Sequence, residues 1–447
     1  MHLSRLIPFM ALSLVAFFSV ANRPAWAADP QGGDDLSMPE LRLSLREAMD
    51  ATVGNNPTVK VLKERIEAAR AVAATQLGAL LPNISSSVRQ SRQNFFQGTI
   101  GLAPVVTPPF SIFDTRANMT QNLFSMSLIH RWKSSREALK VAELESETGQ
   151  FDSMAEAALR YVEALRAEEI LKARDANVKL FEELTNLARN RRGGGMGTGL
   201  DTARAEAQLE NERQQLALAK GEAERTKLVL LHAMGIPFNV RLVLTDNLKA
   251  EVSDAPGLEE ALKAALASRV ELLAQLKRIK SSSLALDSTV YERLPSLILQ
   301  GDYGLIGNRM TNTADTYTVA GLLSVPIFDG GQREGRISES RSLAKQELYK
   351  LVVIQNQVAL DVREALVTLE SARDQVSIAK RGLQSAVSEQ EIARERFTIL
   401  TSQSNLELTN ALFSLARARD NAVDALFRLN ATRVHLARAT GKLAELH

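Results

Sequence analysis

The chain has 447 residues, of which 45% are apolar, 5% aromatic and 24% charged, so it is long and apolar enough to form a large folded body. Lys and Arg number 54 against 52 Asp and Glu, and Arg5 and Arg23 lie in an N-terminal segment without acids, so the remaining charges balance. This balance argues against a nucleic-acid partner, and the absence of cysteine excludes disulfides, thiolate nucleophiles and sulfur-ligated metals.

Residues 1–27 have the pattern of an export signal. Arg5 supplies the positive start, residues 6–20 form an apolar run, and residues 25–27 read Ala-Trp-Ala, a small-x-small cleavage pattern. We therefore expect the mature chain to start at Ala28. No later stretch approaches the ~18 consecutive apolar residues that a membrane-spanning helix needs. If the exported protein enters a membrane, the sequence predicts that it does so through β-strands.

The rest of the sequence contains an internal repeat. Leu45 and Pro82 have counterparts 213 positions later, and Leu200 and Gly235 have counterparts 206 positions later. Further matching residues lie between these landmarks with the same offsets. We therefore predict two repeats, residues 28–235 and 258–447, joined by a connector at residues 236–257.

Each repeat is predicted to open with a helix, at about residues 44–80 and 258–293. Ala, Leu, Glu and Lys dominate both segments, and Pro57 is the only breaker inside them. Pro82 and Pro295 should end these helices, because the residue before a proline avoids the α region.

The segments that follow change to the two-residue period of β-strands. In the second repeat, alternating runs flank a polar loop at residues 307–312, and in the first repeat the runs 84–91 and 113–123 flank a longer loop. We predict two strands per repeat, near residues 83–124 and near residues 295–328, of about ten residues each, which is the length that crosses a tilted bilayer. The predicted lipid-facing residues are Leu297, Leu299, Tyr303, Tyr317, Val319 and Leu323.

Very long helices are predicted after the strands. Residues 332–399 contain no proline, and their apolar and small residues recur in steps of three and four, from Leu351 to Ala386. Residues 128–191 show the same spacing. This pattern indicates an alanine-rich coiled-coil seam. Each rod is predicted to turn, near residues 193–199 and near residues 400–405, and to return as a second helix, which gives two antiparallel helical hairpins.

Four strands per chain cannot close a barrel, because even eight strands leave an interior that side chains fill. Lipid does not tolerate open strand edges, since each unpaired backbone group costs several kcal/mol. If the strands lie in a membrane, several copies must combine, and three copies supply twelve strands around a wet lumen. The other interpretation is a secreted coiled-coil protein whose strands form a small soluble sheet.

Three segments make the sequence resemble the TolC-like outer-membrane efflux family. Residues 294–297 read Leu-Pro-Ser-Leu, residues 324–333 carry Pro-Ile-Phe-Asp-Gly-Gly ahead of a long helix, and Arg396-Phe397 is followed by the Leu-Glu-Leu of residues 406–408 and by Ala411. The resemblance implies a mainly α-helical homotrimer with a twelve-stranded transmembrane β-barrel, continued by a periplasmic helical tunnel. It also implies a periplasmic adaptor protein and an inner-membrane pump as partners that dock at the tunnel's far tip.

The resemblance also points to candidate site residues. Some family members narrow the periplasmic entrance with an acidic ring, and the matching positions here are Glu407 and Asn410, with Asp201 at the equivalent place in the first repeat. For Glu407 the other interpretation is a solvated carboxylate at a helix start, and for Asp201 the favoured interpretation is a residue that caps or starts its helix. The family's glycine in the second turn is replaced by Leu400 or Thr401. The predicted adaptor-facing tip residues are Gly195, Gly197, Gly199, Leu200, Asn405 and Leu406.

Catalytic, cofactor-binding and metal-binding residues are not predicted. The glycine run at residues 193–199 does not fit G-x-G-x-x-G, and the five histidines are scattered. We therefore predict a passive exit duct, the outer-membrane channel component of a tripartite efflux or type I secretion system, in the outer membrane of a Gram-negative bacterium and extending into its periplasm. The alternative is a periplasmic adaptor or coiled-coil scaffold protein.

Overall fold

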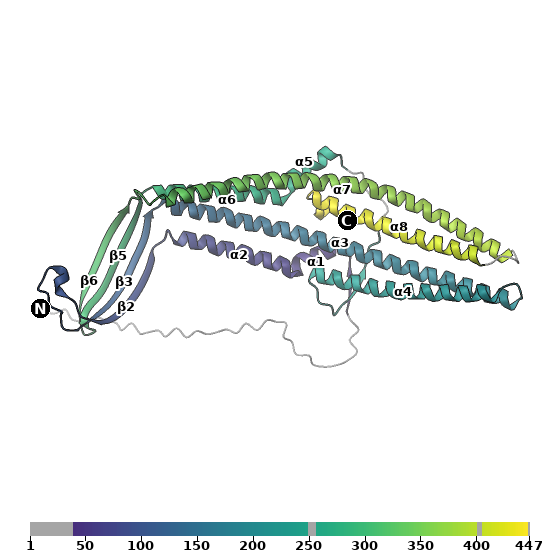
Figure 1. Cartoon of the computed structure of the whole chain (residues 1–447), viewed down its shortest axis with the longest axis horizontal. Coiled ribbons are helices and arrows are strands. Elements are labelled where there is room, and N and C mark those ends of the chain that lie inside the picture. Colours follow the sequence, from purple (N-terminus) through teal and green to yellow (C-terminus); the bar gives the residue numbers. More distant parts are fainter. Residues whose placement is uncertain (1–38, 249–255, 400–404, 446–447) are drawn as a thin grey trace, which may run out of the picture. The chain divides into compact units, whose positions relative to one another are not determined.

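The computed structural model of the chain describes residues 39–248, 256–399 and 405–445 (Figure 1). The predicted export signal at residues 1–27 lies outside the described residues, as do most of the second predicted turn and part of the predicted connector. The strands and helices belong to one compact unit, Glu40–His447.

The same order of elements occurs in both halves of this unit: two short helices, two strands, one very long helix and a returning helix. In the first half they are α1 (Leu45–Asn55), α2 (Pro57–Gly78), β2 (Asn83–Gln93), β3 (Phe110–Phe124), α3 (Met126–Gly193) and α4 (Gly199–Met234). In the second half they are α5 (Leu258–Ser268), α6 (Val270–Val290), β5 (Ser296–Arg309), β6 (Asn312–Ser324), α7 (Gln332–Ile399) and α8 (Leu406–Ala439). The remaining elements are the strands β1 (Glu40–Leu43) and β4 (Arg241–Leu244) and the 3-10 helices η1 (Gln97–Ile100), η2 (Tyr291–Arg293) and η3 (Leu443–Glu445).

Proline interrupts the first predicted helix, as its position in the sequence indicates. α1 ends at Asn55, and Asn56 caps α2 by accepting a hydrogen bond from the Thr58 backbone N–H at 2.7 Å. Pro57 stands at the first position of α2, where its missing N–H costs nothing.

The prediction of one unbroken helix over residues 258–293 is wrong. The helix breaks at Arg269, whose backbone is extended with φ −71° and ψ 119°. The Arg269 side chain is buried and bridges Glu271, at 2.9 Å, and Asp361 on α7, at 2.6 Å. A buried guanidinium must be paired, and the two carboxylates meet this requirement at the break. No proline or glycine marks the break in the sequence.

Four strands form one antiparallel sheet in the order β2-β3-β5-β6, so the two halves of the chain meet at the β3–β5 pair. The prediction of a loop over residues 307–312 is wrong, since β5 extends to Arg309, which pairs with Asn312, and only two residues connect β5 to β6. Most of the polar residues that were predicted to form a loop therefore belong to the ends of the two strands. β3, β5 and β6 have 15, 14 and 13 residues, more than the predicted ten.

The two long hairpins, α3 with α4 and α7 with α8, confirm the predicted rods and their seams. On α7 the seam residues Val358, Val362 and Leu369 are buried, and on α3 Val162 and Leu184 are buried. Near the turns the two hairpins share one core, formed by Phe181, Leu184, Ala205, Phe397, Leu408 and Leu412 with their neighbours. Figure 1 shows the sheet beyond one end of α3 and α7, and the first hairpin turn and the start of α8 at the other end. Among the described residues, no helix has both the length and the apolar character needed to cross a membrane.

Candidate functional sites: the sheet faces and the hairpin turns

One face of the sheet carries the six strand residues predicted to face lipid. Tyr303 pairs with Tyr317, and Leu297 pairs with Leu323, so these side chains lie on the same face, because directly paired residues of antiparallel strands point the same way. Tyr317 is 76% exposed and Val319 is 74% exposed. The six residues predicted to face lipid therefore share one face, and the exposed ones do not pack beneath the helices of their own chain.

The opposite face carries a polar cluster centred on Arg116 of β3. Its guanidinium donates to Asp302 of β5, lies 3.3 Å from Asp114 Oδ1, and donates to Thr316 Oγ1 of β6 at 3.3 Å. This cluster was not predicted from the sequence because alternation in β3 is irregular, although Asp114, Arg116 and Asn118 share one parity. The face opposite the predicted lipid-facing residues therefore carries a charged, hydrogen-bonded cluster, alongside the apolar Ile298, Ile306 and Leu322.

Asp201 lies in the first turn of α4, as expected for a residue at a helix start. Thr198 caps the helix, accepting from the Asp201 backbone N–H at 3.1 Å, and its hydroxyl donates to Asp201 Oδ2 at 2.6 Å. The Asn405 side chain, at the start of α8, donates to the Asp201 carbonyl oxygen at 2.8 Å. The first turn therefore holds the N-terminal end of α8.

Two glycines of the first turn are required for different structural reasons. Gly195 has φ 73°, the left-handed region that favours glycine. A Cβ on Gly197 would lie 3.0 Å from the Arg192 backbone nitrogen, so this position needs a close backbone approach. Leu200 and Leu406, the predicted tip residues on α4 and α8, are exposed. Their contact with an adaptor protein stays a prediction.

Arg191 joins the two hairpins at their turns. Its side chain is buried, donates a hydrogen bond to the Phe397 backbone carbonyl of α7, and places its guanidinium carbon 4.3 Å from the centre of the Phe397 ring. Arg189 instead pairs with Glu206 at 2.8 Å within the first hairpin. We call the contact of Arg191 with Phe397 the tip latch.

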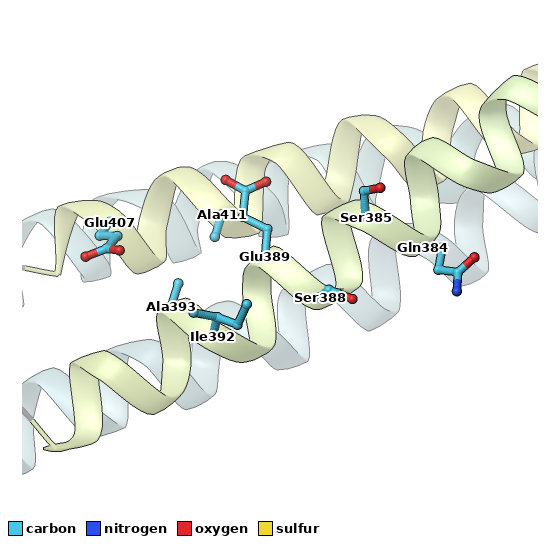
Figure 2. Close-up of a pocket in the computed structure, with 8 residues that line it drawn as sticks. All are labelled: Gln384, Ser385, Ser388, Glu389, Ile392, Ala393, Glu407 and Ala411. Atoms are coloured by element: carbon cyan, nitrogen blue, oxygen red, sulfur yellow. The ribbon is translucent and has the colours of Figure 1, made fainter.

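Glu407 borders a groove between α7 and α8 near the second turn. Its carboxylate accepts from Arg396 of α7 at 2.7 Å, and both side chains are exposed. Figure 2 shows Glu407 on α8 and Glu389 on α7, both bordering this groove. The residues lining the groove are Gln384, Ser385, Ser388, Glu389, Ile392, Ala393, Glu407 and Ala411. Asn410 is exposed and is not among these lining residues.

Glu389, the second carboxylate of this groove, was not among the predicted residues. A hairpin brings residues at similar distances from its turn to face each other, as Ala393 and Ala411 do across this groove. Glu389 lies one helical turn before Ala393 and therefore shares its face of α7. This spacing of four residues is the signal that could have found it. The ion pair with Arg396 also means that part of the Glu407 charge is compensated within the chain.

A buried charge cluster ties the first hairpin to α8 farther from the turns. Arg174 of α3 donates to Asp420 of α8 at 2.6 Å and lies 3.9 Å from Glu212 of α4, which is buried. Within the described residues, one oxygen of each carboxylate is buried without a hydrogen-bond partner. Burial raises the pKa of Glu212 above its usual 4.5 and the pKa of Asp420 above its usual 3.8, although Arg174 opposes both shifts.

This cluster predicts a pH dependence of stability. Because the folded state holds these protons to a higher pH than the unfolded chain, the contribution of Glu212 and Asp420 increases as the pH falls from neutrality towards their usual pKa values. In the wild type, the thermal unfolding midpoint should therefore rise as the pH is lowered from about 7 to about 5. We expect Glu212→Gln to make this rise smaller. The matched control is Glu210→Gln, an exposed carboxylate on the same helix, which should keep the wild-type difference. Equal pH dependence in both variants would contradict the prediction.

A family model described as outer membrane efflux protein matches residues 48–236 and 261–442, one segment in each half of the chain. The chain belongs to the outer membrane efflux protein family. Membership confirms the resemblance read from the sequence and the expected location in the outer membrane of a Gram-negative bacterium. It also agrees with the expectation that the chain is not an enzyme.

Named proteins and solved structures show similarity in sequence and in fold. The outer membrane efflux protein BepC of Brucella suis is 23% identical over 295 residues, which span 63% of this chain and 63% of BepC. The fold is similar to the CmeC outer membrane channel of Campylobacter jejuni, with a TM-score of 0.77 and 19% identity over 89% of this chain and 86% of CmeC. It is also similar to the open state of the Neisseria gonorrhoeae MtrE outer membrane channel, with a TM-score of 0.75 and 18% identity over 89% of each chain.

Proposed function

We propose that three copies of this chain form a passive outer-membrane duct, the exit component of a tripartite efflux or type I secretion system. Twelve strands would form the barrel, and the helical hairpins would continue it as a tunnel across the periplasm. An inner-membrane pump would supply the energy, and a periplasmic adaptor protein would dock at the hairpin turns. The chain itself would catalyse no reaction.

The sheet carries this proposal. In the order β2-β3-β5-β6, the outer edges of β2 and β6 are unpaired among the described residues. One face is apolar and exposed at Tyr317 and Val319, while the other holds the cluster around Arg116. Joining β2 of one copy to β6 of the next satisfies both edges, and the two faces then suit lipid outside and water inside. The same exposed face argues against a periplasmic scaffold.

The helices support association with further copies. On α7, Val353, Leu360 and Val367 are exposed and follow one another at intervals of seven residues. This is the spacing of a coiled-coil stripe, and it lies apart from the buried Val358 and Val362 that pack within the chain. An exposed apolar stripe of this kind is typical of a surface that another helix covers. A neighbouring copy supplies such helices by symmetry.

The entrance of the tunnel would lie at the hairpin turns. Three copies of Glu407 around the threefold axis would form the ring that we propose at this entrance, with Arg396 reducing its net charge and with Glu389 nearby. The exposed Leu200 and Leu406 would face the adaptor. We also propose that residues 1–27 are removed on export and that residues 28–235 and 258–447 are repeats of one unit, which the shared element order supports.

The proposal predicts a conducting trimer. The chain purified from outer membranes in detergent is expected to have the mass of three chains, and planar bilayers containing it should show single-channel conductance. A monomer without conductance would overturn the proposal.

Two matched variants test the assignment of the faces. Val319→Lys places a charge on the apolar face of β6 and is expected to prevent assembly, because a lysine facing lipid at mid-membrane costs about 2–4 kcal/mol. Thr318→Lys places the same charge on the opposite face and is expected to assemble and to shift selectivity towards anions. Equal behaviour of the two variants would contradict the assignment.

A further inference from the structure

The segment that connects β2 to β3, residues 94–109, is unusually apolar for an exposed connection. It contains no Asp, Glu, Lys or Arg. Ile100 is 62% exposed and Leu102 is 58% exposed. The other large apolar side chains exposed in this segment are Phe95, Phe96, Val105 and Val106. Exposed apolar side chains gathered in one segment mark a surface that is covered by protein or lipid.

Backbone hydrogen bonds hold these side chains in an ordered ribbon. The Gln97 N–H donates to the Val105 carbonyl at 2.9 Å, and the Thr107 N–H donates to the Phe95 carbonyl at 2.8 Å. The Thr107 hydroxyl oxygen also accepts from the Phe95 N–H at 2.9 Å. The apolar side chains therefore stay exposed within a hydrogen-bonded shape, and they do not collapse into a core of their own.

The register places the start of this ribbon at the rim of the sheet. Gln93 pairs with Phe110, and Phe113 of β3 pairs with Gly307, three residues before the turn residue Met310. The ribbon therefore begins level with the β5–β6 turn. Arg92, the next residue on β2, pairs with Ser111 and lies on the same face as Val88, which is the exposed apolar face.

Arg92 places a positive charge beside the apolar segment. Its side chain is exposed, and no acidic side chain among the described residues forms an ion pair with it. A cation at the boundary between an apolar wall and water is suited to the phosphate of a lipid headgroup, which accepts charge-assisted hydrogen bonds from guanidinium.

We propose that residues 94–109 lie in the outer leaflet of the membrane, with their apolar side chains among acyl chains and with Arg92 bound to the phosphate of an anionic lipid. This inference rests on the proposed function, which places the apolar sheet face against lipid. A second copy fits the patch less well. The β6 edge of a neighbour would adjoin β2, and its two-residue turn, flanked by the polar Arg309 and Asn312, offers only Met310 as an apolar partner.

Single-cysteine reporters test the inference, because the natural chain has no cysteine. Leu102→Cys probes the ribbon, Val319→Cys probes the apolar strand face, and Met310→Cys, at a position that is 77% exposed on the β5–β6 turn, serves as the aqueous control. Each variant of the full chain carries an environment-sensitive fluorophore and is reconstituted into phosphatidylcholine vesicles, with or without phosphatidylglycerol. Doxyl-labelled lipid is the quencher. We expect the probes at positions 102 and 319 to lose emission to a similar extent, and the probe at position 310 to keep it.

The arms of this experiment separate the inference from the proposed function. Quenching at position 319 without quenching at position 102 would overturn the inference and leave the channel intact, whether or not oxidation then links the Leu102→Cys copies to one another. Absence of quenching at both positions would overturn both proposals. With Arg92 present, phosphatidylglycerol is expected to increase quenching at position 102, and Arg92→Gln should abolish that increase. The same quenching in both lipid mixtures would overturn the assignment of an anionic lipid to Arg92, because phosphatidylcholine also carries a phosphate.

Discussion

Replacing Arg191 with alanine is expected to raise the ratio of open to closed channels by about ten- to thirty-fold. Under the proposed function, the tunnel tip opens when the two hairpins separate near their turns. The tip latch opposes this, since Arg191 donates to the Phe397 carbonyl and covers the Phe397 ring. A hydrogen bond from a charged group contributes about 1.5–3 kcal/mol and a cation–π contact about 0.5–2 kcal/mol. The lower end of the hydrogen-bond term alone, about 1.5–2 kcal/mol, corresponds to the expected change.

Single-channel recording in planar bilayers measures this ratio directly. Arg189→Ala is the matched control, because Arg189 pairs with Glu206 inside the first hairpin and makes an exposed ion pair, which is worth little. Phe397→Leu keeps the backbone carbonyl and removes the ring, so we expect a smaller rise than that of Arg191→Ala. If Arg191→Ala and Arg189→Ala open equally often, the tip latch has no part in gating.

The long helices and the second strand pair could be predicted because their signals are local. A seam of small and apolar residues in steps of three and four needs no knowledge of distant partners, and α7 spans the predicted residues 332–399. The break at Arg269 could not be predicted in this way, because the Asp361 that pairs with it lies 92 positions away. β1 and β4 were missed for the same reason, since each is a four-residue strand that pairs only with the other.

The contacts at the turns depend on how the hairpins pack, so residue type alone predicts them poorly. Glu407 was identified from the sequence, but its ion pair with Arg396 was not. Two interpretations of that carboxylate therefore stayed open. Arg191 and Phe397 lie 206 positions apart, which is the offset between the matching residues of the two repeats. Equivalent positions of the two hairpins therefore meet, and the offset contained a signal for the tip latch that composition and periodicity did not show.

The same offset links two glycines that end the returning helices. Gly235 follows α4 with φ 70°, and Gly441 follows α8 with φ 71°, so both occupy the left-handed region. Each lies beside the break between the two short helices of its half. A Cβ on Gly235 would lie 2.7 Å from the Asn56 Cα and 2.8 Å from the Asn55 carbonyl oxygen, both backbone atoms. A Cβ on Gly441 would meet the Ser268 side chain, with its Oγ at 2.5 Å.

We therefore expect Gly235→Ala to lower the free energy of unfolding by about 3 kcal/mol and Gly441→Ala by about 1–2 kcal/mol. Both variants incur the left-handed penalty of a non-glycine residue, but only the Ser268 side chain can rotate away, whereas the backbone at Asn55 and Asn56 must shift. Urea unfolding followed by the helical circular dichroism signal measures both. Gly382→Ala, in open space within α7, is the control and should stabilise by about 0.5–1 kcal/mol. If Gly235→Ala lowers the free energy of unfolding no more than Gly441→Ala does, the backbone between α1 and α2 can shift to accept the added methyl group. The junction of α1 and α2 would then not fix the end of α4.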